Sequence, residues 1–395
     1  MIGVLEILAL IVLLPIAIVD AVFLCEIAFG LAATPTGATL ELPPSVALLI
    51  PAHNEEASLP AMLAGLADLK AAGARVLLVA DNCGDRTAAI AREAGFDVVE
   101  RNDPARRGKG YALAFGRDRL ALDPPEIVVV LDADCAIDRT ALARIATRAL
   151  STGRVVQAAY VFRPALQASA AVQISNFAFA TKNIVRQRGI ARLGGPAILT
   201  GSGMAFPYAT FANLDLATGN VVEDLVMGIE LIDRGVPPVF EGGATVWSDS
   251  SGDSGTETQR ARWEGGFLAT ARSVAPRLLG AGLAQRRWAK IWMGAHLLVP
   301  PLTLLLLANV VATLVAVILA LTTGIALPAI IGGGLLACLI AAVAAAWMVE
   351  GRRHISGATL LRLPVYIAWK LALYARILGG KRKVAWVRTE RIDRP

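Results

Sequence analysis

The stretch EIVVVLDADC, residues 126–135, decides the fold. Five apolar residues, 127–131, run directly into Asp132 and Asp134, and a run this short and β-branched indicates a strand buried on both faces. Open α/β sheets bind ligands at the carboxyl edge of such strands. Two carboxylates one residue apart at that edge can hold a hard divalent cation such as Mg²⁺ or Mn²⁺, although two ordinary turn aspartates are the plainer alternative.

Strands and helices alternate in the chain before this stretch. Residues 46–50 and 75–80 indicate strands, and Ser58 is a candidate cap for a helix that ends near Gly73. A second helix is expected to stop at Gly95. The alternation predicts an α/β fold with a parallel, doubly wound sheet. The apolar face of the first helix consists of Leu59, Met62, Leu63, Leu66 and Leu69.

The composition indicates a membrane protein. The 395 residues allow two or three domains, and 55% of them are hydrophobic, with a mean hydropathy of +0.58, which is too high for a purely soluble chain. A formal charge of +6 in such a protein more often marks cytoplasmic flanks than a nucleic-acid surface, so no nucleic-acid partner is expected. The four scattered cysteines favour neither a disulfide framework nor a zinc site.

Three long apolar segments predict contact with a lipid bilayer. Residues 1–32 are long enough to span it and lack the basic start and small-residue cleavage site of a signal peptide, so a membrane anchor is expected. Asp20 lies deep enough in this span to need a partner helix. Residues 291–321 and 325–349 predict a transmembrane hairpin with a very short external turn.

Basic residues after the hairpin predict its orientation. They cluster within residues 352–394, which places the C-terminus, and with it residues 33–290, on the cytoplasmic side of an inner membrane. Residues 358–378 are apolar but contain three basic residues, so an interfacial helix is expected rather than a fourth span. Pro300 and Pro301 predict a kink or the start of the first hairpin span.

Further polar groups follow apparent strands or lie in loops. One polar group follows the first strand, and a second polar group follows the second strand. The basic loop RRGKG (106–110) is suited to binding a diphosphate, and an acidic pair precedes an apolar helical run. A solvated charge run would also explain the basic loop, and an N-terminal helix cap would also explain the acidic pair. The residues are His53, Asn54 and Glu55, then Asp81 and Asn82, then Lys109, then Glu223 and Asp224.

Taken in order, seven short motifs resemble the membrane-bound family 2 glycosyltransferases, the group that contains the cellulose, chitin-oligosaccharide and hyaluronan synthases. That group carries separated aspartates followed, about 35 residues after the last, by Q-x-x-R-W, and here Gln259 follows Asp224 by 35 residues. The motifs are PAHNEE (51–56), VADNCGD (79–85), LDADC (131–135), TGSGMAF (200–206), VVED (221–224), QRARW (259–263) and KVAWVRTER (383–391).

The resemblance implies a GT-A catalytic domain and gives the aspartates separate roles. Asp81 resembles the residue that holds the nucleotide base, near the backbone of the PAHNEE loop. Asp134 resembles the metal-binding carboxylate, for Mg²⁺ or Mn²⁺, with Asp132 toward the ribose. Asp224 resembles the general base that takes a proton from the acceptor hydroxyl, with Glu223 behind it.

The QRARW motif is implied to act on the leaving group and the acceptor. Arg262 resembles the cation that stabilises the departing diphosphate, while Gln259 and Trp263 are implied to line the acceptor site. An aromatic anchor at the membrane surface is the plainer interpretation of Trp263. Val222 stands where the polymer synthases have a threonine, and the chain has fewer expected spans than the secreting synthases.

These expectations combine into an inverting membrane glycosyltransferase. It would move a sugar from a UDP-sugar to a saccharide, lipid-linked acceptor in exopolysaccharide or glycoconjugate biosynthesis, and a processive synthase of a β-linked polymer is the alternative. A transporter is disfavoured because the spans lack repeats, and a catalytically dead glycan receptor because the candidate base is retained. The expected domains are a transmembrane helix (1–32), a cytoplasmic GT-A domain (40–275), an interfacial segment with the hairpin (276–350), and an interfacial helix with a basic tail (351–395).

Overall fold

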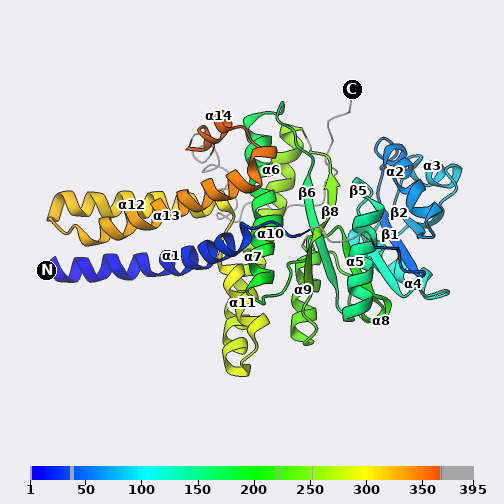
Figure 1. The fold of residues 1–395 in the computed structure, drawn as a ribbon, viewed down its shortest axis with the longest axis horizontal. Coiled ribbons are helices and arrows are strands. Elements are labelled where there is room, and N and C mark those ends of the chain that lie inside the picture. Colours follow the sequence, from blue (N-terminus) through cyan, green and yellow to red (C-terminus); the bar gives the residue numbers. More distant parts are fainter. Residues whose placement is uncertain (1, 36–39, 221, 251, 365, 367–395) are drawn as a thin grey trace. The chain divides into compact units, whose positions relative to one another are not determined.

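The computed structural model describes residues 2–35, 40–220, 222–250, 252–364 and 366, and Figure 1 shows the fold. Contacts divide the chain into two compact units, which are described one at a time. The sheet unit contains the described residues of 34–163 and 196–251, and the helical unit contains those of 1–33, 164–195 and 252–366. The two units interleave along the chain, so their limits do not coincide with residues 40 and 275.

A mixed sheet of eight strands forms the sheet unit across its described residues. The spatial order is β3-β2-β1-β4-β7-β6-β8-β5, which places β4 between β1 and β7. The strands are β1 (Val46–Ala52), β2 (Arg75–Asp81), β3 (Asp97–Arg101), β4 (Ile127–Val130), β5 (Cys135–Ile137), β6 (Val156–Phe162), β7 (Met204–Pro207) and β8 (Val239–Ser248).

The sheet is entirely parallel from β3 to β4 and mixed beyond β4, where β6 pairs in parallel with β8 and β5 pairs antiparallel with β8. β1 pairs in parallel with β2 and β4, and β2 pairs in parallel with β3, as the alternation of strands and helices predicts. β7 runs antiparallel to both β4 and β6, so the prediction of a parallel sheet is wrong for this part. The physical reason is that the chain between β6 and β7 enters the helical unit, so no crossover helix over the sheet imposes a parallel return.

Helices cover the sheet with apolar faces. All four residues of β4 are fully buried, as expected for a central strand. The predicted apolar face of α2 is buried, and Ser58 occupies the predicted N-cap position, but its side chain makes no capping hydrogen bond. The Ser58 backbone is already helical, with φ −89° and ψ −27°, rather than extended as in a side-chain cap, and its hydroxyl donates to Glu55 Oε2 at 2.6 Å. The helices are α2 (Leu59–Ala71), α3 (Thr87–Glu93), α4 (Lys109–Leu120), α5 (Arg139–Thr152), α8 (Tyr208–Ala212) and α9 (Glu223–Asp233).

The helical unit gathers segments that are far apart in sequence. In Figure 1, α1, α12 and α13 lie side by side, and α6 and α10 run across the end of these three helices. A π-helix, Thr181–Arg186, continues α6 into α7. The other elements are α1 (Ile2–Gly30), α6 (Ala170–Ala180), α7 (Gln187–Arg192), α10 (Asp253–Gln285), α11 (Trp288–Leu298), α12 (Leu302–Thr323), α13 (Leu327–Val349), a 3₁₀ turn (Gly351–Arg353) and α14 (Gly357–Leu360).

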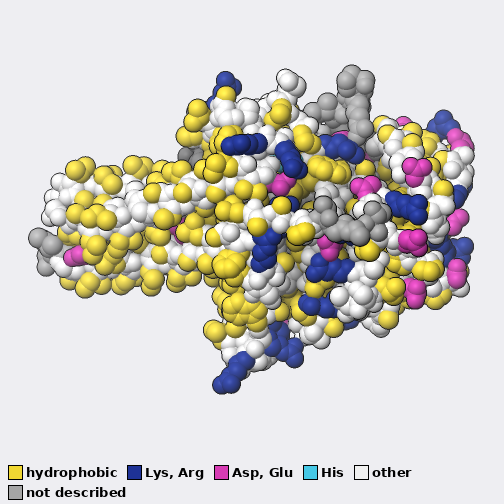
Figure 2. Space-filling model, viewed as in Figure 1, with side chains coloured by type: hydrophobic (Ala, Val, Ile, Leu, Met, Phe, Trp, Pro, Cys, Tyr) yellow, Lys and Arg dark blue, Asp and Glu magenta, His cyan; other side chains and the backbone are white. Residues whose placement is uncertain are grey.

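Within the described residues, three helices are long and apolar enough to cross a membrane: α1, α12 and α13. Hydrophobic side chains cover this part of the helical unit in Figure 2. The predicted run 291–321 is not one helix, because Pro301 is the N-cap of α12 and α11 ends before it. Of the two outcomes predicted for the proline pair, the start of a span is therefore the one observed.

Polar residues of α1 have partners within the helical unit. Asn309 Nδ2 of α12 donates to Asp20 Oδ1 at 3.0 Å, which supplies the partner helix that Asp20 was expected to need. Arg186 Nε donates to Glu26 Oε2 at 2.5 Å, and His296 Nδ1 lies 2.8 Å from Glu26 Oε1. These contacts attach α1 to the rest of the unit through fully buried polar groups.

Two predictions at the C-terminus fall largely outside the described residues. Of the expected interfacial helix 358–378, the structure describes α14 and the residues up to 364, and residue 366. Residues 367–378, the basic tail and the motif KVAWVRTER are not among the described residues.

Candidate active site

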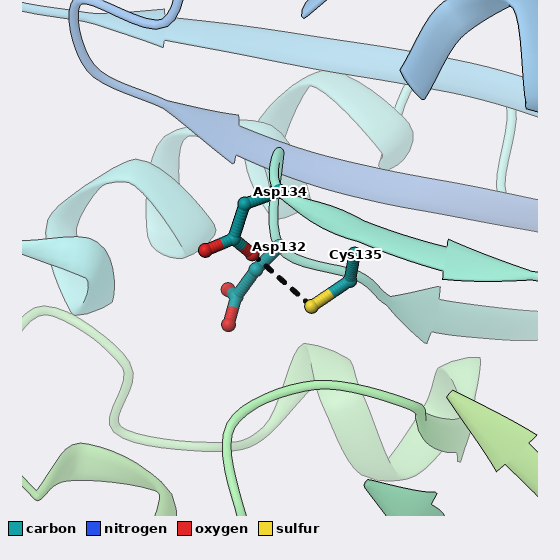
Figure 3. A group of neighbouring side chains, drawn as sticks. All are labelled: Asp132, Asp134 and Cys135. Atoms are coloured by element: carbon teal, nitrogen blue, oxygen red, sulfur yellow. Dashed lines mark hydrogen bonds between the residues drawn. The ribbon is translucent and has the colours of Figure 1, made fainter. Parts of the chain in front are cut away.

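Asp132 and Asp134 lie in the turn that joins β4 to β5. Figure 3 shows that their side chains and that of Cys135 lie on the same side of this turn. One carboxylate oxygen of each aspartate and Cys135 Sγ all lie within 4.8 Å of one another. The strand-end rule thus brings three ligand-type atoms together at the middle of the sheet, beside β1 and β7.

The donor set of this turn fits a hard divalent cation through oxygen. Burial, and then the Asp132 charge, raise the pKa of the Cys135 thiol to about 12, so at neutral pH the sulfur keeps its proton. The thiol points toward Asp134 and lies 3.1 Å from Asp134 Oδ1. Soft metals favour thiolates, whereas Mg²⁺ and Mn²⁺ favour carboxylates, so the residues present fit the harder ions.

Lys109, the first residue of α4, lies beside the aspartate turn. Its ammonium forms an ion pair with Asp132 and donates to the Gly201 carbonyl at 2.6 Å. Burial alone would lower the pKa of Lys109, but the charges of Asp132, Glu223 and Asp224 outweigh it and raise the pKa. Lys109 is therefore held fully protonated among carboxylates. The basic-loop prediction placed it near a diphosphate, and the structure places it beside the candidate metal turn.

The acidic pair Glu223 and Asp224 forms the first turn of α9. Asp224 Oδ1 accepts the backbone N–H of Leu225 at 2.8 Å, and the helix N-terminus favours negative charge there. Burial, and then the neighbouring Asp224 charge, raise the pKa of Glu223 to about 8. The pair therefore favours one ionised and one protonated carboxyl group at neutral pH.

The loop directly before β7, residues 200–203, connects the acidic pair of α9 with the aspartate turn. This loop belongs to the TGSGMAF motif. Asp132 N–H donates to Ser202 Oγ at 3.1 Å. Gly201 has φ +87°, and a Cβ added there would lie 3.3 Å from both Asp224 Oδ2 and Lys109 Nζ. Glycine is required at Gly201 for its backbone conformation, and it also leaves room for these two side chains.

The loops after β1 and β2 meet at the carboxyl edge of the sheet. His53 Nδ1 lies 2.7 Å from the Asp81 carbonyl oxygen, and Gly84 N–H donates to Asn54 Oδ1 at 2.8 Å. Glu55 instead turns toward α2 and accepts the Ser58 hydroxyl. The structure therefore brings His53 and Asn54 next to the Asp81 loop, while Glu55 organises the start of a helix.

Sequence reasoning missed Arg101 as a neighbour of Asp81. Arg101 Nη1 donates to Asp81 Oδ1 at 2.6 Å, and its guanidinium lies 5.4 Å from the centre of the Tyr111 ring. Asn82 Nδ2 donates to the same Asp81 oxygen at 3.0 Å. Arg101 is the last residue of β3, so the strand-end rule that found Asp81 and Asp132 would also have found Arg101 had β3 been placed.

The QRARW residues lie on α10 in the helical unit. Trp263 stacks on Phe179 of α6 with ring centres 5.7 Å apart, and the Arg260 guanidinium lies 5.3 Å from the Trp263 ring centre. Trp263 therefore packs within the protein. Gln259 and Arg262 are both partly buried. These residues belong to the helical unit and the aspartates to the sheet unit, and their roles at one common site remain predictions.

Comparisons with known proteins give the family. The model of the family described as "Glycosyltransferase like family 2" matches residues 43–266, more than half of the chain. An uncharacterized glycosyltransferase of Mycobacterium tuberculosis is 40% identical over 94 residues, which are 24% of this chain and 38% of that protein. The 4,4'-diaponeurosporenoate glycosyltransferase of Staphylococcus haemolyticus is 34% identical over 98 residues, which are 24% of this chain and 25% of that protein. The matches span less than two thirds of each curated relative.

A solved structure gives the fold. The mannosyltransferase PcManGT from Pyrobaculum calidifontis, in complex with GDP-Man and Mn²⁺, superposes with a TM-score of 0.57 at 16% identity, covering 96% of this chain and 100% of that one. At this identity the likeness concerns the fold, a GT-A mixed α/β sheet accompanied by apolar helices. Together with the family match over residues 43–266, it shows that the chain belongs to the glycosyltransferase-like family 2.

Proposed function

We propose that the protein is an inverting, metal-dependent glycosyltransferase that moves a sugar from a nucleotide sugar to a hydroxyl group of a saccharide acceptor. One observation carries this proposal. In the sheet unit, the Lys109 ammonium lies against Asp132 and Gly201 and within the electrostatic reach of Glu223 and Asp224. A candidate diphosphate-binding cation, a candidate metal turn and a candidate base therefore belong to one cluster.

Asp224 is proposed to act as the general base. Its carboxylate accepts a backbone N–H at the start of α9, an arrangement that stabilises the ionised form and fixes its direction. It would take the proton of the acceptor hydroxyl as the oxygen attacks the sugar from the side opposite to the diphosphate, which inverts the anomeric centre. Glu223, with its raised pKa, would remain protonated and so spare Asp224 a second negative charge.

Positive groups are proposed to stabilise the departing diphosphate. Asp134 and Asp132 would hold the divalent cation, which when bound neutralises phosphate charge. Lys109 would shift from Asp132 toward the phosphates, and Arg262 of α10 would add a second positive charge. The Mn²⁺ and GDP-Man in the Pyrobaculum mannosyltransferase are a metal and donor of the proposed kind.

The nucleotide base is proposed to bind at the loops after β1 and β2. The Asp81 carboxylate, held by Arg101, would accept an N–H of the base, beside His53 and Asn54. Uracil offers such a group, which supports a UDP-sugar as the donor. Guanine offers one as well, so a GDP-sugar is the alternative that the donor screen must include.

The membrane is proposed to hold the enzyme beside a lipid-linked acceptor. α1, α12 and α13 would span an inner membrane, with the GT-A domain, about residues 40–275, and the tail on the cytoplasmic side. The basic residues after the hairpin support this orientation. A cysteine introduced at Arg382 should resist membrane-impermeant reagents in intact cells, whereas one at Thr323 should react. Labelling at position 382 would contradict the orientation.

Addition of one sugar, or a few, is proposed over synthesis of a long polymer. Q-x-x-R-W favours the processive alternative, because Trp263 offers a flat apolar face for a sugar ring. Export of a polymer, however, needs polar groups that line a path through the bilayer. Asp20 and Asn309, the polar pair between α1 and α12, are hydrogen-bonded to each other and buried, so this pair does not line such a path. The product would then serve exopolysaccharide or glycoconjugate assembly after another protein moves it across the membrane.

A donor screen tests the proposed function. Purified protein in detergent is given UDP- and GDP-sugars with a lipid-linked saccharide, with Mn²⁺, with Mg²⁺ or with excess EDTA. We expect metal-dependent nucleotide release with one donor and a product that mass spectrometry sizes as the acceptor plus one or a few sugars. A ladder extending to long polymer would favour the processive alternative. Absence of transfer from every nucleotide sugar would reject the proposal.

A further inference from the structure

Gln157, in the second position of β6, has a fully buried side chain whose hydrogen bonds leave the β-ladder. Its Nε2 donates to the Ser202 carbonyl at 2.9 Å and to the Ala158 carbonyl at 2.8 Å. Its Oε1 accepts the Thr200 N–H at 2.9 Å. Both amide hydrogens and the oxygen are therefore used, and an inverted amide would oppose like groups at all three contacts.

The loop that Gln157 holds cannot satisfy its own backbone. Gly201 and Gly203 have φ values of +87° and +69°, so residues 200–203 leave the extended conformation before β7 begins. The register of β6 with β7 starts at the Gln157 and Met204 pair. Gly203 continues this pairing through its backbone, because its carbonyl accepts the Ala158 N–H and its N–H donates to the Val130 carbonyl. The Thr200 N–H and the Ser202 carbonyl have no place in that ladder, and a buried backbone group needs a partner.

The same loop touches the donor side and the base side of the cluster. Ser202 Oγ accepts the Asp132 N–H, and the Gly201 carbonyl accepts the Lys109 ammonium. The Gly201 backbone also lies against the Asp224 carboxylate, as its missing Cβ shows. A shift of this loop therefore changes the positions of Asp132, Lys109 and Asp224 together.

We infer that Gln157 is a positioning residue for sugar transfer: its amide fixes the 200–203 loop, and the loop sets the distance between the donor-binding groups Asp132 and Lys109 and the base Asp224. This inference rests on the proposed function. A displacement of about 1 Å between reacting groups can lower a rate about a hundredfold, so Gln157 acts on the reaction without touching a substrate.

The first test replaces Gln157 by methionine, which keeps the volume and removes the hydrogen bonds. We expect kcat/KM for the nucleotide sugar to fall about 10- to 100-fold at every pH, as expected for misplaced reacting groups. Gln173→Met is the matched control. Gln173 is a buried glutamine of α6 that also donates to two carbonyls, those of Leu166 and Ala168, and accepts one backbone N–H, that of Ser356. It should lose comparable thermal stability but keep its kcat/KM.

The second test uses Gln157→Glu and has a readout that a merely structural role would not move. A protonated glutamic acid can donate to the Ser202 carbonyl, whereas the carboxylate would face two carbonyl oxygens in a buried site. We expect the kcat/KM of this variant, divided by that of the wild type, to rise about tenfold as the pH falls from 9 to 6, with a hundredfold as the upper limit set by the Met variant. The titratable and charged groups that face the loop are the same in both proteins, so the division removes their effect. They are Asp132, Cys135, Lys109, Glu223 and Asp224.

The outcomes are distinct. The inference is overturned if the kcat/KM of Gln157→Met lies within about twofold of the wild-type value, or if the kcat/KM of Gln157→Glu equals that of Gln157→Met at every pH. In either case, transfer by the wild type still upholds the proposed function. An inactive wild type rejects the proposed function instead. In that case calorimetric binding of UDP with Mn²⁺ decides the role of the loop: weaker binding by Gln157→Met than by Gln173→Met supports it, and equal binding overturns it.

Discussion

Two glutamates, one in each compact unit, have opposite surroundings. Glu26 of the helical unit lies between Arg186 and His296, with contacts of 2.5 and 2.8 Å. Glu223 of the sheet unit lies beside another acid, Asp224, and burial with that neighbour raises the pKa of Glu223 to about 8. The helical unit thus neutralises a buried carboxylate with dedicated partners, whereas the sheet unit places one carboxyl group against another.

We expect this difference to separate residues that hold the fold from residues that bind a ligand. A buried carboxylate with matched partners stabilises the arrangement around it, and removal of a partner is strongly destabilising. Asp132, Glu223 and Asp224 all act on the Lys109 ammonium, and burial together with the neighbouring Asp224 charge raises the pKa of Glu223. Clustered charges that shift pKa values are typical of functional sites. The predictions below test this contrast.

The largest effect is expected from Asp134→Ala or from chelation. Either change should lower transfer at least about a thousandfold, because a bound metal contributes several kcal/mol to stabilising a diphosphate leaving group. Nucleotide release measured with and without EDTA checks this. Asp138→Ala is the control, because Asp138 Oδ1 caps α5 by accepting the Ala141 N–H and is not a proposed metal ligand. Equal activity in excess EDTA would remove the metal from the mechanism.

The next effect concerns stability in the helical unit. Arg186→Met should destabilise the protein by about 3–5 kcal/mol, because it leaves Glu26 buried without its cation. Thermal unfolding in detergent measures the loss. Arg86→Met removes an exposed pair with Glu93, at 3.2 Å, and should change stability by less than about 1 kcal/mol. If the two variants unfold alike, the Glu26 contact is not the attachment proposed for α1.

A smaller effect is expected at the ammonium of the sheet unit. Lys109→Met should weaken nucleotide-sugar binding about 10- to 100-fold, as expected for loss of a hydrogen-bonded charge of about 1.5–3 kcal/mol. Calorimetric titration with the donor analogue UDP measures this. Lys70→Met, which removes an exposed lysine over the Phe96 ring, should bind like the wild type. Unchanged affinity in Lys109→Met would show that Lys109 serves the fold alone.

The sequence predicted the parallel half of the sheet and the acids that follow its strands. β4 is apolar on both faces and β-branched, so its strand and its two aspartates follow from local pattern. The antiparallel return of β7 did not follow, because it depends on the excursion of residues 164–195 into the helical unit, a long-range arrangement.

Candidate site residues were predictable where a strand or helix end carries a charge, as at Asp132, Lys109 and Glu223. The residues that position these side chains were harder to predict from the sequence. Gln157 lies within a strand, and its sequence context does not distinguish it from other polar strand residues. Its role depends on the contact with the 200–203 loop, which is distant in sequence. Arg101 required placing β3, whose sequence DVVER is short and charged at both ends.

A further predicted effect is a change in the pH dependence of stability. Because the pKa of Glu223 is about 8 in the folded protein and near its ordinary value of 4.5 when unfolded, the folded state binds the extra proton. Its contribution to stability is fully present below about pH 4.5 and is lost as the pH rises through 8. The melting temperature should therefore fall less between pH 5 and 8 in Glu223→Gln than in the wild type.

Glu230→Gln is the control for that slope. Glu230 lies on the same helix and pairs with Arg234, so it should leave the wild-type pH dependence in place. Identical slopes in Glu223→Gln and the wild type would mean that Glu223 is ionised in the folded protein, and that the contrast with Glu26 is smaller than the structure indicates.

The central claim is that Asp224 is the base of a sugar-transfer reaction, and Asp224→Asn tests it most directly. Asparagine keeps the size and can still accept the Leu225 N–H, but it cannot take a proton. Single-turnover transfer and calorimetric binding of UDP with Mn²⁺ are measured on the same preparation. The account predicts binding within about threefold of the wild type and a transfer rate at least about a hundredfold lower, the scale of general-base catalysis. Near-normal transfer by Asp224→Asn would contradict it.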